Sequence, residues 1–140
     1  MKNIFLDTDI LIDFLGDRKP FSRFSLTIFL NAYNKKITVY TSGNSITTAY
    51  YILSKQTTEK HARELIVGLM HQITIIPVTE NILQNAFSSN FADVEDAVQF
   101  FSALTVSDMY CIVTRNIRDY RKSTIPVFSS EELLLKDLSK

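Results

Sequence analysis

Residues 3–15 read NIFLDTDILIDFL and place three aspartates within an almost wholly apolar run. Continuous apolar runs are typical of strands that are covered on both faces, so we expect a buried strand over residues 3–7. Burying a carboxylate without a partner is costly, which favours a place where the chain leaves the core. Asp7 lies at the end of the strand, and parallel sheets bind ligands beyond this end. Its position therefore marks Asp7 as a candidate functional acid.

Strand-like and helix-like segments alternate along the rest of the chain. A helix over residues 9–16, capped by Thr8 or Asp9 and ended by Gly16, follows the first strand. We expect further strands at residues 37–42, 73–78, 109–114 and 125–128, and further helices from Pro20 and at residues 45–55, 59–72, 79–87, 94–104 and 129–138. This order predicts an α/β fold with a mostly parallel five-stranded sheet and helices on both of its faces.

The composition is that of an ordinary globular protein. A chain of 140 residues is long enough for one domain with a real core, so we expect a single domain over residues 1–140. The zero formal net charge argues against a strongly electrostatic, non-specific nucleic-acid binder, although local basic patches remain open. The single cysteine, Cys111, stands in an apolar run and is expected to be a buried structural thiol, which fits a reducing, cytoplasmic location. We expect no signal peptide and no membrane span.

Carboxylates occur at three separated places that a parallel sheet could gather. Besides Asp7 at the first strand, Glu95 and Asp96 lie in the first turn of the helix that Asp93 opens, and Asp119 follows the fourth strand. Three such charges repel one another strongly unless a cation intervenes. Oxygen ligands of this kind suit Mg²⁺ or Mn²⁺ rather than zinc.

Each acid also has an ordinary structural interpretation. Asp7 and Asp9 could cap a helix or stabilise a turn, and Asp96 could complement the dipole of its own helix. Asp119 could be a turn residue, and Glu95 is more typical of a solvated helix acid. Asp13 faces away from the strand end, so we expect it on the surface. The joint placement of Asp7, Asp96 and Asp119 is what favours a functional site.

Three blocks of the sequence together resemble one known family, the PIN domain of VapC-like toxins. They are FLDTDILIDFL at residues 5–15, FADVEDAVQFFSAL at 91–104 and CIVTRNIRDY at 111–120, the last followed by STIPVFSSEELL at 123–134. The resemblance covers essentially the whole chain, with the blocks in order and at suitable spacing. It implies a three-layer α/β/α sandwich and a metal-dependent ribonuclease.

The resemblance also assigns expected roles to individual residues. It implies that Asp7, Asp96 and Asp119 are the catalytic acids and, together with Glu95, the ligands of Mg²⁺ or Mn²⁺. Polar support would come from the side chains of Thr8, Thr114 and Asn116. Arg115 and Arg118, which flank the expected site, would hold the backbone of the RNA substrate. The resemblance further implies an antitoxin partner protein and a homodimer.

The chain departs from the family pattern at Thr48. The family usually places a glutamate in the helix after the second strand, in a pattern like T-x-x-E-x-Y, whereas this chain reads SITTAYYIL with Thr48 at that place. Losing one carboxylate weakens cation binding. Glu95 could partly compensate, although adjacent residues of a helix point about 100° apart.

Two alternatives remain open at this point. The missing glutamate would also suit a PIN-like module that binds RNA or protein without catalysis. The segment LDTDIL further matches the D-x-D signature of haloacid-dehalogenase-type phosphatases, with Asp7 as nucleophile and Asp9 as acid. The phosphatase interpretation lacks a suitable later lysine and a GDxxxD-type acidic pair, and the chain is short for that fold.

Overall fold

The computed structural model describes residues 1–138 and contains one five-stranded sheet. All neighbouring strands are parallel, and their order across the sheet is β3-β2-β1-β4-β5. The strands are β1 (Lys2–Leu6), β2 (Ile37–Ser42), β3 (Thr74–Ile76), β4 (Met109–Val113) and β5 (Val127–Phe128). The first strand of the chain is therefore the central strand of the sheet, with β2 and β4 on either side.

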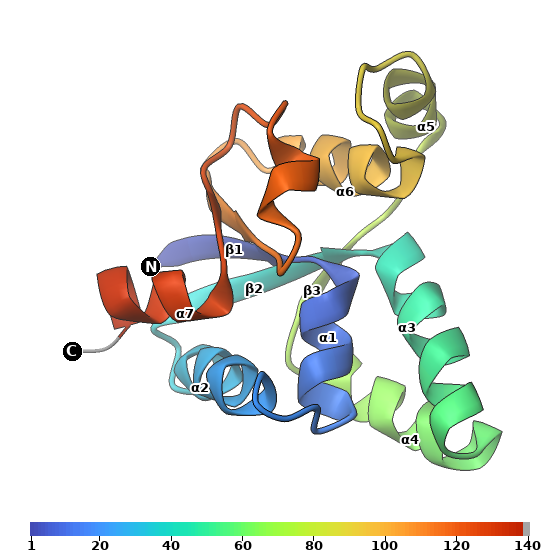
Figure 1. The fold of residues 1–140 in the computed structure, drawn as a ribbon, viewed down its shortest axis with the longest axis vertical. Helices are drawn as coiled ribbons and strands as arrows, with labels where there is room; N and C mark the ends of the chain where they lie inside the picture. Colours follow the sequence, from blue (N-terminus) through green and yellow to red (C-terminus); the bar gives the residue numbers. More distant parts are fainter. Residues whose placement is uncertain (139–140) are drawn as a thin grey trace.

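Helices cover both faces of the sheet, as Figure 1 shows. One face carries α1 (Thr8–Leu15), α2 (Ser22–Tyr33), α3 (Gly43–Gln56), α4 (Glu59–Met70) and α7 (Ser130–Leu133), which continues as a π-helix over Leu134–Leu138. The other face carries α6 (Val94–Leu104) with α5 (Glu80–Phe87) outside it, and the short 3₁₀ helix η1 (Ile117–Tyr120). This arrangement is the expected α/β/α sandwich.

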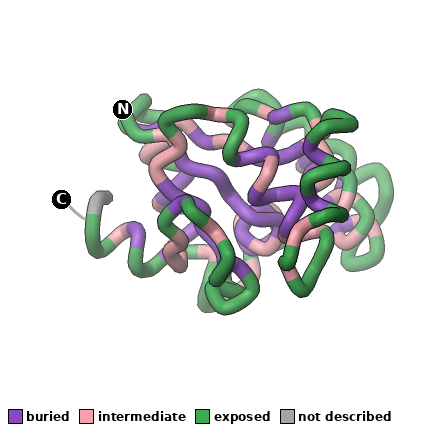
Figure 2. The backbone as a smooth tube through the Cα atoms, turned by 90° about the horizontal axis from the view of Figure 1, so that it is seen from above, coloured by how far each residue is buried: buried purple, intermediate pink, exposed green. Residues whose placement is uncertain are grey.

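Alternation along the central strands divides the core between the two faces. Ile4 and Leu6 of β1 pack toward α1, α2 and α3, whereas Phe5 packs toward α6 and η1. The same alternation places Cys111 and Ile112 of β4 in opposite halves of the core. In Figure 2 the buried backbone runs through the centre of the molecule, and exposed turns surround it. The expected burial of Cys111 is confirmed.

Several expected boundaries move by a few residues. Pro20 lies in a turn, and α2 begins at Ser22. The strand expected over residues 73–78 ends at Ile76, just before Pro77, which has no N–H to offer the ladder. Ser129 is the N-cap of α7 and forms a capping box with Glu132. It is one of the two cap residues, Ser129 and Ser130, that the sequence predicted. The expected domain end, residues 139–140, lies outside the described residues.

The topology brings the ends of β1, β2 and β4 to the same edge of the sheet. Since all strands are parallel, the residues that follow Leu6, Ser42 and Val113 lie next to one another at this carboxyl edge. Loops at this edge lead into α1, α3 and η1. Within residues 1–138, no helix is both long and apolar enough to cross a membrane.

Candidate active site

Asp7 lies where β1 ends and also caps α1. Its side chain accepts a hydrogen bond from the backbone N–H of Thr8 at 2.6 Å, and its own backbone N–H donates to the carbonyl of Val113 at 2.9 Å. The cap of α1 is thus Asp7, and the expectation of Thr8 or Asp9 was wrong by one or two residues. The strand and the helix together fix this buried carboxylate in place.

Two residues beyond β4 support Asp7 and its neighbour Asp9. The hydroxyl of Thr114 donates to Oδ2 of Asp7 at 2.6 Å and accepts from the backbone N–H of Asn116 at 3.0 Å. The Asn116 side-chain amide then donates to Oδ2 of Asp9 at 2.9 Å. Thr114 and Asn116 therefore link the loop after β4 to both acids at the start of α1.

The pKa of Asp7 is raised to about 6, chiefly by burial and also by the nearby charge of Asp9. The polar neighbours Thr114, Gln99 and Thr8 act in the opposite direction, because they stabilise the ionised form. The carboxylate is therefore held in a position where its negative charge is poorly compensated.

Asp96 comes to the same edge from the other side of the sheet. It lies in the first turn of α6, where its backbone N–H donates to the side chain of the cap residue Asp93 at 3.1 Å. The buried Tyr120 lies with its hydroxyl 3.4 Å from Oδ1 of Asp96. Burial, followed by the charges of Asp7, Asp93 and Asp119, raises the pKa of Asp96 to about 7. Asp7 and Asp96 are thus close enough to repel each other.

Asp119 contributes charge rather than a direct contact. It is an exposed residue of η1, and its charge raises the pKa of Asp96. Within residues 1–138, no three acidic, histidine or cysteine side chains lie close enough together in this conformation to form a metal site. The structure therefore brings together the two acids Asp7 and Asp96, with Asp119 at a greater distance.

Glu95 turns toward the helix that lacks the family glutamate. Its Oε2 accepts a hydrogen bond from the hydroxyl of Thr48 at 3.2 Å and lies 3.5 Å from the side-chain amide of Asn44. Both partners lie on α3. A carboxylate from α6 therefore lies beside the position where the family carries its own carboxylate on α3.

A buried polar chain that the sequence reasoning missed lies behind the acids. The hydroxyl of Ser42 lies 3.0 Å from that of Ser45, which donates to Oε1 of Gln99 at 2.9 Å. All three side chains are fully buried. Gln99 stands within the otherwise apolar stripe of α6, between Val98 and Phe100, and this interruption was the available signal.

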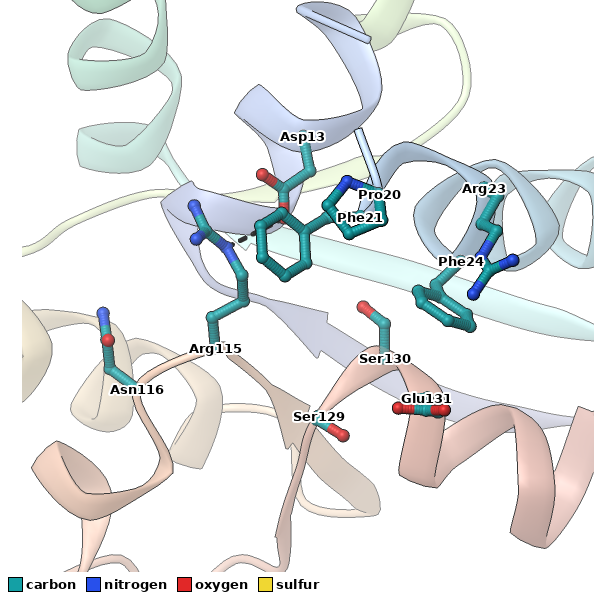
Figure 3. A pocket seen from close by; sticks show the side chains of 10 residues that line it. All are labelled: Asp13, Pro20, Phe21, Arg23, Phe24, Arg115, Asn116, Ser129, Ser130 and Glu131. Carbon is teal, nitrogen blue, oxygen red and sulfur yellow. Dashed lines mark ion pairs between the residues drawn. The ribbon is translucent and has the colours of Figure 1, made fainter. Parts of the chain in front are cut away.

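Asp13 is buried, so the expectation that it lies on the surface was wrong. Only 1% of the residue is exposed, and its charge is balanced by the Arg115 guanidinium, whose Nε lies 3.0 Å from Oδ2 of Asp13. A charged residue of α1 can face inward because a cation from the loop after β4 meets it. Arg115 thus holds Asp13 and also lies over the ring of Phe21, as Figure 3 shows. Arg118 is an exposed residue of η1.

The donor chemistry of the edge fits a hard divalent cation. Asp7 and Asp96 offer only oxygen ligands, and both have raised pKa values that a nearby positive charge would reverse. One buried oxygen here, Oγ1 of Thr8, has no hydrogen-bond partner. Mg²⁺ usually keeps several waters and binds through one or two carboxylates, so it needs no cluster of three acids.

Comparison with known proteins agrees with this geometry. The family model described as PIN domain matches residues 3–118. Ribonuclease VapC1 of Aquifex aeolicus is 26% identical over 136 residues, which cover 94% of this chain and 92% of the relative.

Solved structures share the fold at low sequence identity. VapBC2 from Rickettsia felis, bound to a DNA fragment from its promoter, matches with a TM-score of 0.64 at 14% identity, covering 91% of this chain and 97% of the other. A toxin–antitoxin complex from Klebsiella pneumoniae matches with a TM-score of 0.64 at 21% identity and the same coverage. VapC20 of Mycobacterium tuberculosis, a toxin that cleaves the sarcin–ricin loop, matches with a TM-score of 0.60 at 14% identity, covering 78% of this chain and 86% of the other. By its sequence match and its architecture, this chain belongs to the PIN-domain family.

Proposed function

We propose that the chain is a metal-dependent endoribonuclease of the VapC type, which hydrolyses phosphodiester bonds of single-stranded RNA with Mg²⁺ or Mn²⁺. The observation that carries this proposal is the pair Asp7 and Asp96, two carboxylates at one sheet edge whose pKa values are raised to about 6 and about 7. Family membership and the similarity to a ribonuclease support the same activity.

Asp7 and Asp96 would hold the ion, with Asp119 and Glu95 adding negative charge around it. When bound there, the metal would neutralise charge on the phosphate and make a water a stronger nucleophile. Thr114 and the N–H of Thr8 hold the carboxylate of Asp7 in a fixed orientation. Tyr120 keeps its hydroxyl beside Asp96 on the opposite side of the edge. The protein thus supplies a prearranged, partly dry acidic edge, and no nucleophilic side chain is required.

Glu95 offers a reason why catalysis would survive Thr48. The hydrogen bond from Thr48 holds the Glu95 carboxylate against α3, so negative charge is present beside the place where the family keeps its glutamate. We therefore favour an active enzyme over the alternative of a PIN-like module that binds RNA or protein without cleaving it. Family membership also favours a nuclease over a haloacid-dehalogenase-type phosphatase.

The biological setting that we propose is a toxin–antitoxin pair. Structural neighbours include a VapBC complex and a toxin–antitoxin complex, which supports a partner protein that covers the acidic edge. A homodimer and a cytoplasmic location belong to the same proposal. Arg118, exposed on η1 close to the acids, would contact the RNA backbone, whereas the guanidinium of Arg115 is partly engaged by Asp13.

RNA cleavage by the wild type and matched variants tests the proposed activity. Cleavage of a labelled single-stranded RNA should require Mn²⁺ or Mg²⁺, stop with EDTA, and fall at least a hundredfold in Asp7→Asn and Asp96→Asn. Asp17→Asn is the matched control, because Asp17 is exposed beyond α1 and asparagine tolerates its positive φ of 48°. Equal cleavage by wild type and Asp7→Asn would show that the activity comes from a contaminant or from another site.

A further inference from the structure

A cavity with aromatic and charged lining residues lies beside the acidic edge. Its volume is about 510 Å³, and it lies between the end of α1, the start of α2, the loop after β4 and the start of α7. Figure 3 shows Phe21 and Phe24 along one side and Arg115 with Asn116 along another. Specific small-ligand pockets have volumes of about 300–1,000 Å³, so this cavity is of a suitable size for one nucleotide.

Asp13 lines the cavity through its ion pair with Arg115, and its other carboxylate oxygen has no hydrogen-bond partner. Its Oδ2 pairs with Arg115 at 3.0 Å, but its Oδ1 is buried and has no hydrogen-bond partner. The nearest cation to this second oxygen is Arg18, whose Nη1 lies 3.8 Å away, too far for a hydrogen bond. Because this oxygen is itself buried, a ligand in the cavity would contact the Arg115 side of the ion pair and not Oδ1.

Two aromatic rings that line the cavity are each in contact with an arginine guanidinium group. The guanidinium of Arg115 lies 4.5 Å from the centre of the Phe21 ring, and that of Arg23 lies 4.7 Å from the centre of Phe24. Phe21 remains 39% exposed although it is a large apolar side chain. Rings and guanidinium planes are the surfaces on which unpaired bases stack, and arginines also bind phosphate.

The cavity is continuous with the acidic edge through three successive residues. Thr114 binds Asp7, Arg115 lines the cavity, and Asn116 lines the cavity while donating to Asp9. A strand with one phosphate at Asp7 would therefore have a neighbouring nucleotide within reach of this cavity.

We propose that this cavity is a subsite for one unpaired nucleotide of the RNA, next to the phosphate that is cleaved. The base stacks against Phe21 or Phe24, and its phosphate lies toward Arg115 and Arg23. This inference rests on the proposed ribonuclease function, because it names how that same site holds its substrate.

The charges favour a nucleotide over a cationic side chain of a protein partner. Asp13 is already paired with Arg115 at 3.0 Å and faces Arg18 at 3.8 Å, so Glu131 is the lining acid left to attract a cation, against the two lining arginines Arg23 and Arg115. An anionic phosphate matches these arginines, and the attached base matches the two aromatic rings.

Binding in EDTA separates this subsite from catalysis. The probe is a 5′-fluorescein-labelled single-stranded RNA decamer, measured by anisotropy with the metal-free wild type. We expect Phe21→Ala and Phe24→Ala to weaken binding about 5- to 100-fold, the loss that follows removal of a stacking platform. Phe87→Ala is the matched control, since Phe87 is 71% exposed on α5 and lies on the other face of the sheet. Circular dichroism melting verifies that each variant is folded.

Photocrosslinking gives a second readout without any substitution in the cavity. In EDTA, a decamer that carries one 4-thiouridine should crosslink to the wild type at Phe21, Phe24 or their immediate neighbours. Crosslinks confined to other surfaces, or unchanged affinity in both phenylalanine variants, would overturn the subsite. If the subsite alone fails, wild type and both variants still cleave equally with Mn²⁺; if the ribonuclease function fails, no cleavage occurs whatever the binding result.

Discussion

The hydroxyl of Thr114 donates a hydrogen bond to Oδ2 of Asp7 across 2.6 Å, and this contact joins the ends of the neighbouring strands β1 and β4. The two residues are 107 positions apart in the sequence. The bond lowers the pKa of Asp7 against the effect of burial, and it fixes one of the two carboxylate oxygens. A threonine that precedes the loop to η1 is therefore a positioning residue for the candidate catalytic acid.

Replacing Thr114 with valine tests whether the hydroxyl of Thr114, and not the volume of its side chain, positions the carboxylate of Asp7. Thr114→Val keeps the side-chain volume but leaves the buried Oδ2 of Asp7 without its donor, so we expect at least tenfold slower cleavage with Mn²⁺ and a loss of about 1–2 kcal/mol in the free energy of unfolding. The pH at which cleavage becomes half-maximal should also rise, since the bond favours the ionised acid. Thr114→Ser should recover most of the rate, and full activity in Thr114→Val would contradict this role.

Without metal, the protein should become more stable as the pH falls from about 7 toward 5. The folded pKa values of Asp7 and Asp96 are about 6 and about 7, above the ordinary value of 3.8, so the folded state binds more protons than the unfolded state in this window. Stability therefore decreases as the pH rises through it. Thermal melting in EDTA across pH 5–8 measures the effect. Asp96→Asn should flatten the curve, whereas Asp17→Asn should leave it unchanged.

Mn²⁺ should raise the melting temperature of the wild type at neutral pH. An ion that binds only the folded state at a hundred times its Kd adds about 2.7 kcal/mol, which corresponds to several degrees for a chain of this length. Asp7→Asn and Asp96→Asn should lose most of this increase. An equal increase in all three proteins would place the ion elsewhere, and no increase in the wild type would favour the non-catalytic alternative.

Moving a carboxylate between α6 and α3 should test whether Glu95 replaces the family glutamate. Glu95→Gln should reduce cleavage about tenfold or more, because the hydrogen-bonded carboxylate beside Thr48 is lost. The double variant Thr48→Glu with Glu95→Gln should restore much of the rate, since it returns the charge to α3. The measurement is the cleavage rate of the wild type and both variants at saturating Mn²⁺. If Glu95→Gln cleaves as well as the wild type, Glu95 has no part in the site.

Removing Arg115 should reduce the free energy of unfolding more than neutralising its partner Asp13 does. Arg115→Gln leaves a buried carboxylate without its closest partner and should cost about 3 kcal/mol, whereas Asp13→Asn removes the buried charge and should cost less. Urea denaturation of both single variants and the double variant gives the coupling energy. Arg118→Gln, on the exposed surface of η1, should stay within about 0.5 kcal/mol of the wild type. If Arg115→Gln has the same free energy of unfolding as the wild type, Asp13 is not charged in the folded protein.

The repeating order of strands and helices was enough to predict the sandwich, because period and turn residues are local properties. The same reasoning placed Asp7 at a strand end and Asp96 in the first turn of a helix, and both reach one edge of the sheet. It could not show the buried pairing of Asp13 with Arg115, since no local pattern reveals a partner about a hundred residues away. Nor could it show how far Asp119 lies from the other acids, which depends on the path of one short loop.

The central position of β1 has a consequence for the newly made protein. β1 pairs with β4 on one of its two edges, and β4 is synthesised much later than β1. Asp7 can accept its hydrogen bond from Thr114 only after residue 114 has left the ribosome. Truncated or still-growing chains would therefore lack the assembled acidic edge. Under the proposed ribonuclease function, chains that end before Thr114 would lack the assembled site with which to cut RNA.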